Sequence, residues 1–94
     1  MEIDAVVRVT FTPNIQRHLT CPPSEVSGGT VRAVLDSVFA VNEAARGYVL
    51  DDRGALRQHM MIFIDGQPIR DRAKLSDPVP DSAEVYVMQA LSGG

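Results

Sequence analysis

The side chains that most often catalyse reactions or bind metals are few and poorly grouped in this sequence. Its two histidines, His18 and His59, lie far apart. His18 and Cys21 together offer two metal ligands, whereas a zinc site needs three or four. Cys21 stands beside a proline and is better explained as a small strand residue than as a nucleophile. We therefore expect no metal site.

The acidic residues and the glycine pairs do not form a recognisable catalytic motif either. Asp51 and Asp52 carry carboxylates that can act as acid and base, but the run Asp51-Asp52-Arg53-Gly54 is also typical of a turn. Gly28-Gly29 lacks the lysine and the spacing of a phosphate-binding loop. These patterns do not favour an enzyme.

The chemical feature that remains is the carboxylate of Gly94, in the pair Gly93-Gly94 that ends the sequence. An α-carboxyl has a pKa of about 3.3–3.7 in model peptides, so it is ionised at neutral pH. A carboxylate can act as an oxygen nucleophile. Two glycines, which lack Cβ atoms, can enter a narrow channel. Such a pair ends roughly 1–2% of chains by chance, and we interpret Gly94 as the reacting residue.

The composition limits the classes of partner. The 94 residues are enough for one domain. A formal net charge of −3 argues against nucleic acid, which requires a basic surface. No apolar run approaches the roughly 20 residues of a membrane span, and the first residues do not resemble a signal peptide. The single cysteine excludes an internal disulfide. We expect a cytoplasmic protein that binds neither nucleic acid nor membranes.

Alternating apolar residues predict the strands. Ala5–Phe11 places Val7, Val9 and Phe11 on one face. A shorter strand is expected through His18–Cys21, stopped by Pro22-Pro23, and the two should form an antiparallel hairpin.

Two further strands are predicted in the second half of the sequence. Met60–Ile64 is strongly apolar, and Asp65-Gly66 should turn it back through Gln67-Pro68-Ile69. Glu84–Met88 is the last predicted strand.

One helix is expected between these strands, from about Val31 to Ala45, with Thr30 as its N-cap. Its apolar face comprises Val31, Val34, Leu35, Val38 and Phe39. One helix on one face of a mixed sheet of four to five strands is a two-layer α+β domain, the β-grasp or ubiquitin-like arrangement. We expect the domain to span residues 1–88, and residues 89–94 to form a flexible extended tail.

A β-grasp domain that ends in Gly-Gly resembles the ubiquitin-like sulfur carrier proteins of the MoaD/ThiS family. The matching segments are Thr30-Val31, Val34-Leu35, Phe63–Ile69, Asp81–Met88 and Ser92-Gly93-Gly94. The resemblance implies that an E1-like adenylyltransferase uses ATP to adenylylate Gly94, and that a sulfur donor then displaces AMP and leaves a thiocarboxylate. It also implies a protein co-substrate without a bound cofactor, or the small subunit of a synthase such as molybdopterin synthase.

The recipient of the sulfur stays open at this point. A sulfur-accepting synthase in molybdopterin, thiamine or cysteine biosynthesis is compatible with the resemblance. So are two functions of other classes: a ubiquitin-like modifier that joins Gly94 to a lysine of another protein, and a β-grasp interaction domain with an inert tail. A thiocarboxylate product and an isopeptide product distinguish the carrier from the modifier.

Alternation in the last two long strands also predicts a partner-binding surface. One set of side chains suits the core under the helix: Met60, Ile62, Ile64, Val85 and Val87. The intervening side chains then form an apolar patch beside the tail, of the kind that mixes methionine with aromatic residues at protein contacts. The predicted patch is Met61, Phe63, Tyr86 and Met88, extended by Leu91 and Ser92. The alternatives are a covering loop or the reverse assignment of faces.

Overall fold

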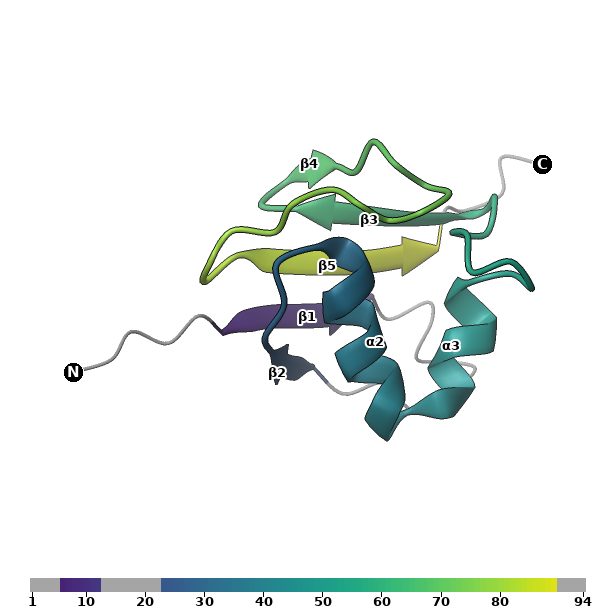
Figure 1. Cartoon of the computed structure of the whole chain (residues 1–94), viewed down its shortest axis with the longest axis horizontal. Coiled ribbons are helices and arrows are strands. Elements are labelled where there is room, and N and C mark those ends of the chain that lie inside the picture. The colour runs from purple at the N-terminus through teal and green to yellow at the C-terminus, as the bar shows by residue number, and fades with distance from the viewer. Residues whose placement is uncertain (1–5, 13–22, 90–94) are drawn as a thin grey trace.

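The computed structural model describes residues 6–12 and 23–89, in which five strands form one mixed sheet with helices on one face (Figure 1). The strands are β1 (Val7–Phe11), β2 (Ser24–Val26), β3 (Met60–Ile64), β4 (Gln67–Pro68) and β5 (Glu84–Gln89). Their order across the sheet is β2-β1-β5-β3-β4. β5 runs parallel to β1 and antiparallel to β3, and it is therefore paired on both sides. This arrangement confirms the predicted β-grasp class of fold.

The first hairpin is antiparallel, as predicted, but its second strand lies elsewhere. β2 pairs Val26 with Val7 and Ser24 with Val9, so the paired segment follows the prolines that were expected to end it. Proline has no N–H to donate to a ladder, which makes it compatible with the start of an edge strand such as β2. The segment expected to be the strand, His18–Cys21, lies outside the described residues.

Two helices occupy the region where one was expected. Thr30 caps α2 (Val31–Val41) by accepting a hydrogen bond from the Ala33 N–H at 3.2 Å. The helix ends at Asn42, whose φ of −146° is not helical, and α3 (Glu43–Val49) begins directly afterwards. The prediction of one helix to Ala45 was therefore wrong at its C-terminal end. Asparagine favours helix caps over helix interiors because its side chain competes for backbone hydrogen bonds.

The core lies between the sheet and the two helices (Figure 1). All five residues of the predicted apolar helix face are buried. The inward side chains of the sheet are buried too, as alternation predicts: Val7, Val9, Phe11, Met60, Ile62, Val85 and Val87. Ile64 is half-buried against the same cluster. From α3, Ala45 and Val49 complete the packing.

Turns and arginine side chains fix the connections between these elements. Asp65 and Gly66 have φ of 50° and 87°, the left-handed pair of a two-residue hairpin, which confirms the predicted turn between β3 and β4. The Arg32 guanidinium donates to the Gly54 carbonyl at 2.9 Å and to the Lys74 carbonyl at 3.3 Å. One side chain of α2 thereby holds two loops that have little regular structure of their own.

The approach to α2 generates a matched test of packing. A Cβ at Gly28 would lie 2.9 Å from the Val34 nitrogen, whereas a Cβ at Gly29 would meet nothing within 4 Å. We expect Gly28→Ala to lower the free energy of unfolding by about 1–3 kcal/mol, as overpacking does. Gly29→Ala should change it by less than about 0.5 kcal/mol. Urea denaturation of both variants measures this, and equal stabilities would contradict the close contact.

Candidate functional site

The face of the sheet opposite the helices carries the predicted patch. Phe63 of β3 is paired with Tyr86 of β5, and Met61 is paired with Met88. Tyr86 is 42% exposed, and the other three side chains are half-buried. The assignment of faces is therefore the predicted one, because Val85 and Val87, which alternate with these residues in β5, are buried. Aromatic and methionine side chains that stand opposite one another in a sheet also stabilise its pairing.

The same face changes from charged to apolar along β5. Near the start of the strand, Glu84 is paired with Arg8, and Arg8 forms an ion pair with Glu25 at 3.6 Å. Toward the end of the strand stands the Met61–Met88 pair. The apolar end of the face is thus the end from which the chain continues into residues 90–94.

Strand register adds two neighbours that the sequence did not identify. Thr10 is the partner of Tyr86 on β1, and Pro68 is the partner of Phe63 on β4. Together with the aromatic pair they form one row across four strands. No local pattern in the sequence indicates this row, because it depends on which strands are neighbours.

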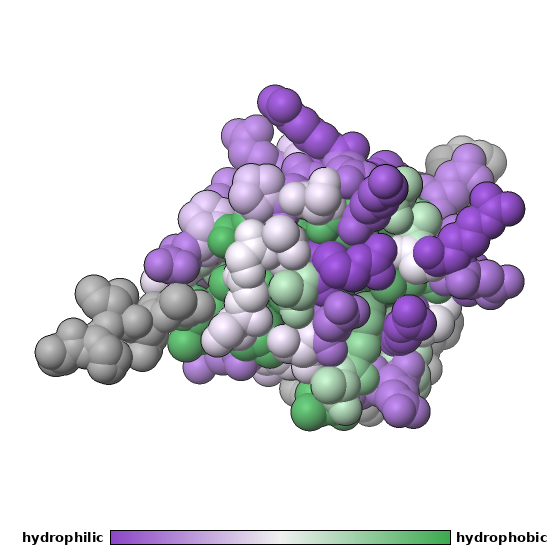
Figure 2. Space-filling view, in the orientation of Figure 1, coloured by the Kyte–Doolittle hydropathy of each residue, from purple (hydrophilic) through white to green (hydrophobic). Residues whose placement is uncertain are grey.

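The helix-covered side has a different surface. Figure 2 shows that it is mixed, hydrophilic toward the top and right of the view, with near-neutral and apolar areas toward the left and bottom. Val41, at the end of α2, is 82% exposed and is the large apolar residue on this side with the greatest exposure in the described part of the chain. A single exposed apolar side chain is ordinary on protein surfaces.

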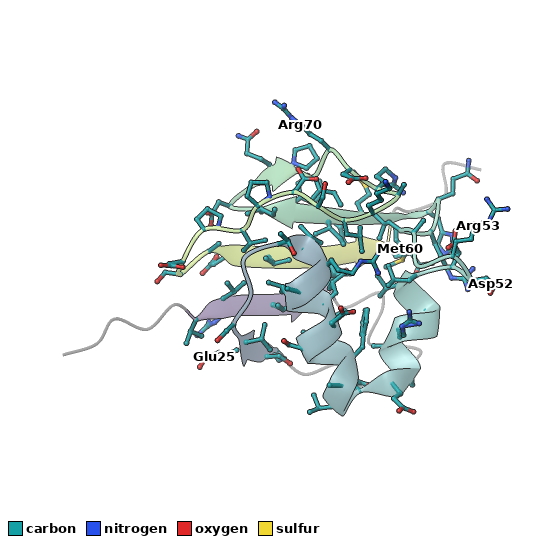
Figure 3. All side chains as sticks on the ribbon, viewed as in Figure 1. Glu25, Asp52, Arg53, Met60 and Arg70 are labelled. Carbon is teal, nitrogen blue, oxygen red and sulfur yellow. The ribbon has the colours of Figure 1, made fainter. Side chains whose placement is uncertain are left out.

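The carboxylates that were candidates for acid–base chemistry are engaged in loops. Asp51 accepts the backbone N–H groups of Ala55 and Arg53 at 3.0 and 2.9 Å. These hydrogen bonds, that from Ala55 first, lower the pKa of the Asp51 carboxyl. Asp52 is exposed on the same turn, which Figure 3 places at the opposite end of the molecule from Glu25. A structural role in this turn is thus enough to explain Asp51 and Asp52.

Asp71 organises the next loop in a similar way. Its carboxylate accepts hydrogen bonds from the N–H groups of Lys74 and Ala73, at 2.9 and 3.2 Å, and from the Ser76 hydroxyl. The Lys74 N–H, followed by the Ser76 hydroxyl, lowers the pKa of Asp71 from 3.8 to about 2. Leu75 in this loop is fully buried and belongs to the core.

The remaining predicted residues are placed as follows. His59 is exposed before β3, and the described residues contain no group of three or more potential metal-ligating side chains. In that same part of the chain, no helix has the length and apolar character to cross a membrane. Several predicted residues lie outside the described ranges: His18, Cys21, Leu91, Ser92, Gly93 and Gly94.

The Asp71 loop predicts a pH dependence of stability. A carboxyl whose pKa is lower in the folded than in the unfolded protein stabilises the fold above its unfolded pKa, and this contribution is lost as the pH falls through the folded pKa. We expect Asp71→Asn to be less stable than wild type at neutral pH, with the difference shrinking between about pH 4 and pH 2. Thermal unfolding as a function of pH checks this. Asp52→Asn is the control, and a constant difference at Asp71 would contradict the prediction.

Known proteins resemble this chain in structure more clearly than in sequence. No protein-family model matches it, and no curated protein shows significant sequence similarity to it. Among solved structures, SAMP1 from Haloferax volcanii superposes with a TM-score of 0.79 at 18% identity, over 95% of this chain and 99% of that one.

Two further solved structures also superpose on this chain over nearly its whole length. CysO in the BexX/CysO complex of Amycolatopsis orientalis has a TM-score of 0.78 at 19% identity, over 94% of this chain and 99% of the matched chain. Small archaeal modifier protein 1 from Methanosarcina acetivorans has a TM-score of 0.76 at 26% identity, over 99% and 100% of the two chains. The chain therefore has the ubiquitin-like β-grasp fold that the sequence predicted, and it shares this fold with SAMP1 and CysO.

Proposed function

We propose that this protein is a sulfur carrier whose Gly94 carboxylate is the reacting group. It serves as a co-substrate: an E1-like adenylyltransferase activates Gly94, a sulfur donor converts it to a thiocarboxylate, and a synthase accepts the sulfur. ATP is bound by the activating enzyme and not by this chain.

One observation carries the proposal. The apolar patch of Met61, Phe63, Tyr86 and Met88 stands on the open face of β3 and β5, and β5 is the strand that leads in sequence to Gly93-Gly94. A partner that docks on this patch therefore contacts the strand from which the sequence continues to the carboxylate that the partner has to activate. Patches that mix methionine with aromatic residues are enriched at protein–protein contacts.

The proposed reaction uses the carboxylate twice. A Gly94 carboxylate oxygen attacks the α-phosphorus of ATP, a new O–P bond forms, and pyrophosphate leaves. The resulting acyl-adenylate is then attacked at its carbonyl carbon by a sulfur nucleophile supplied by the donor, and AMP leaves with the electron pair of the broken C–O bond. With a persulfide donor this attack gives an acyl disulfide. A second thiol then attacks the donor's own sulfur, a disulfide forms on the donor, and the thiocarboxylate of Gly94 leaves with the electron pair of the broken S–S bond. The side chains of this protein need take no part in either step.

A specific observation favours a second candidate function, conjugation to other proteins. The Methanosarcina acetivorans protein is named a small archaeal modifier, and at 26% identity it matches this chain over 99% of its length. A modifier would use the same activated Gly94, with a lysine amine of the target as the nucleophile. The mass of the product decides between them, since the carrier gains sulfur in place of oxygen and the modifier gains a protein.

The exposed patch predicts a separation of binding from stability. Tyr86→Ala and Phe63→Asp should leave the domain folded and weaken its binding to the activating enzyme by more than about 1 kcal/mol, as truncation of an interface anchor commonly does. Isothermal titration calorimetry measures the affinity and circular dichroism the fold. Val41→Ala is the matched control, because Val41 is the other exposed large apolar residue among those that the structure describes, and it belongs to α2. Equal losses at Val41 and Tyr86 would contradict docking on the sheet face.

The C-terminal residue predicts a positional effect. Deleting Gly94, or adding one residue after it, moves the carboxylate by roughly 3.3–3.6 Å in an extended chain. A displacement of about 1 Å from the reacting geometry can slow a reaction by about 10²-fold. We therefore expect both variants, and Gly93→Val, to lose ATP–pyrophosphate exchange with the activating enzyme, while thermal stability stays nearly unchanged. Full exchange by the Gly94 deletion would overturn the proposed function.

A further inference from the structure

The last residue of β5 breaks the pattern of its inward face. Val85 and Val87 are buried beneath the helices, and alternation puts Gln89 on the same side. Gln89 is half-buried and is paired with Met60, which is fully buried between the sheet and the helices (Figure 3). A polar side chain in such a place requires a hydrogen-bond partner, since a half-buried amide without one destabilises the fold.

Tyr48 of α3 supplies that partner. Its hydroxyl donates to the Gln89 Oε1 atom at 3.0 Å, while its ring packs against the core cluster. The hydrogen bond joins the C-terminal turn of α3 to the end of β5, which lies at the α3 end of the sheet (Figure 1).

The helix that presents Tyr48 is itself held firmly. Ala45 and Val49 bury one side of α3 in the core. On the other side, the Arg57 guanidinium donates to the Gly47 carbonyl at 2.9 Å, and the Arg57 N–H donates to the Val49 carbonyl at 3.0 Å. The backbone of Tyr48 therefore has little freedom, and its hydroxyl is a fixed point rather than a mobile surface group.

We propose that Tyr48 is a positioning residue, which through Gln89 fixes the point at which the chain leaves the sheet toward Gly94. This inference rests on the proposed function, because it concerns the delivery of the Gly94 carboxylate. Strand ends fray readily, and fraying at Gln89 would shift the origin of the five residues that follow. The hydrogen bond from α3 adds a restraint on the side chain of Gln89 to the backbone pairing with β3.

The first experiment measures the restraint itself. Tyr48→Phe removes the hydroxyl and keeps the ring, and we expect amide hydrogen exchange at Met88 and Gln89 to become roughly fivefold faster, the population change that loss of one net hydrogen bond produces. Exchange at Val85 should stay unchanged. Tyr86→Phe is the matched control, since it removes the hydroxyl of the other tyrosine in the sequence, on the opposite face of the sheet. Unaltered exchange in Tyr48→Phe would overturn the proposal.

The second experiment measures positioning in the reaction. In ATP–pyrophosphate exchange with the activating enzyme, Tyr48→Phe should lower kcat by roughly fivefold and leave the KM for this protein unchanged, because the docking face is intact. Gln89→Met should have the same effect, and Tyr48→Phe with Gln89→Met should be no worse than either alone. Gln89→Glu, which keeps an acceptor for the Tyr48 hydroxyl, should retain most of the wild-type kcat.

The outcomes separate this proposal from the proposed function. A normal kcat in Tyr48→Phe, or additive losses of kcat in the double variant, would overturn the positioning role of Tyr48. Pyrophosphate exchange by the wild-type protein in the same assay would still support Gly94 as the reacting residue. A wild-type chain that supports no pyrophosphate exchange would overturn the proposed function and the positioning role together.

Discussion

The parallel pairing of β1 with β5 is the constraint on which the rest of the structure depends. The Arg8 N–H donates to the Ala83 carbonyl and the Thr12 N–H to the Val87 carbonyl, each at 3.1 Å, which locks the first described strand against the last. Parallel neighbours require a long crossover. Here the connection contains β2, α2, α3, β3 and β4, and β3 pairs with the other side of β5. The described domain is thus assembled around one central strand.

A two-layer domain of this size can cover only one face of its sheet. The described helices cover the face that carries Val85 and Val87, whereas Tyr86, on the other face, is 42% exposed. The buried valines and the exposed tyrosine both follow from the alternation of side chains along β5, because alternate residues of a strand point to opposite faces. The same strand therefore supplies the centre of the core and the centre of the candidate binding surface.

Local features of the sequence predicted much of this arrangement. The strand faces, the five buried positions of α2, its Thr30 cap and the Asp65-Gly66 turn depend on residues close together in the sequence, and the structure bears them out. The break at Asn42 escaped prediction because Ala40 before this asparagine and Ala44 and Ala45 after it all favour a helix. The Tyr48–Gln89 hydrogen bond escaped it because it joins distant segments, although a polar residue that follows two buried valines at alternate positions was its visible sign.

The carboxylates of the described domain and the carboxylate proposed to react have opposite requirements. Asp51 and Asp71 are surrounded by backbone N–H groups that lower their pKa values and occupy their oxygens, and this suits them to hold loops and not to transfer protons. A reacting carboxylate must keep its oxygens free and must still reach its target with a precision of about 1 Å. Placing it beyond the last strand satisfies the first requirement. The need for precision is served by the strand from which that segment begins. β5 is paired on both sides, and a strand with two neighbours frays less than an edge strand with one.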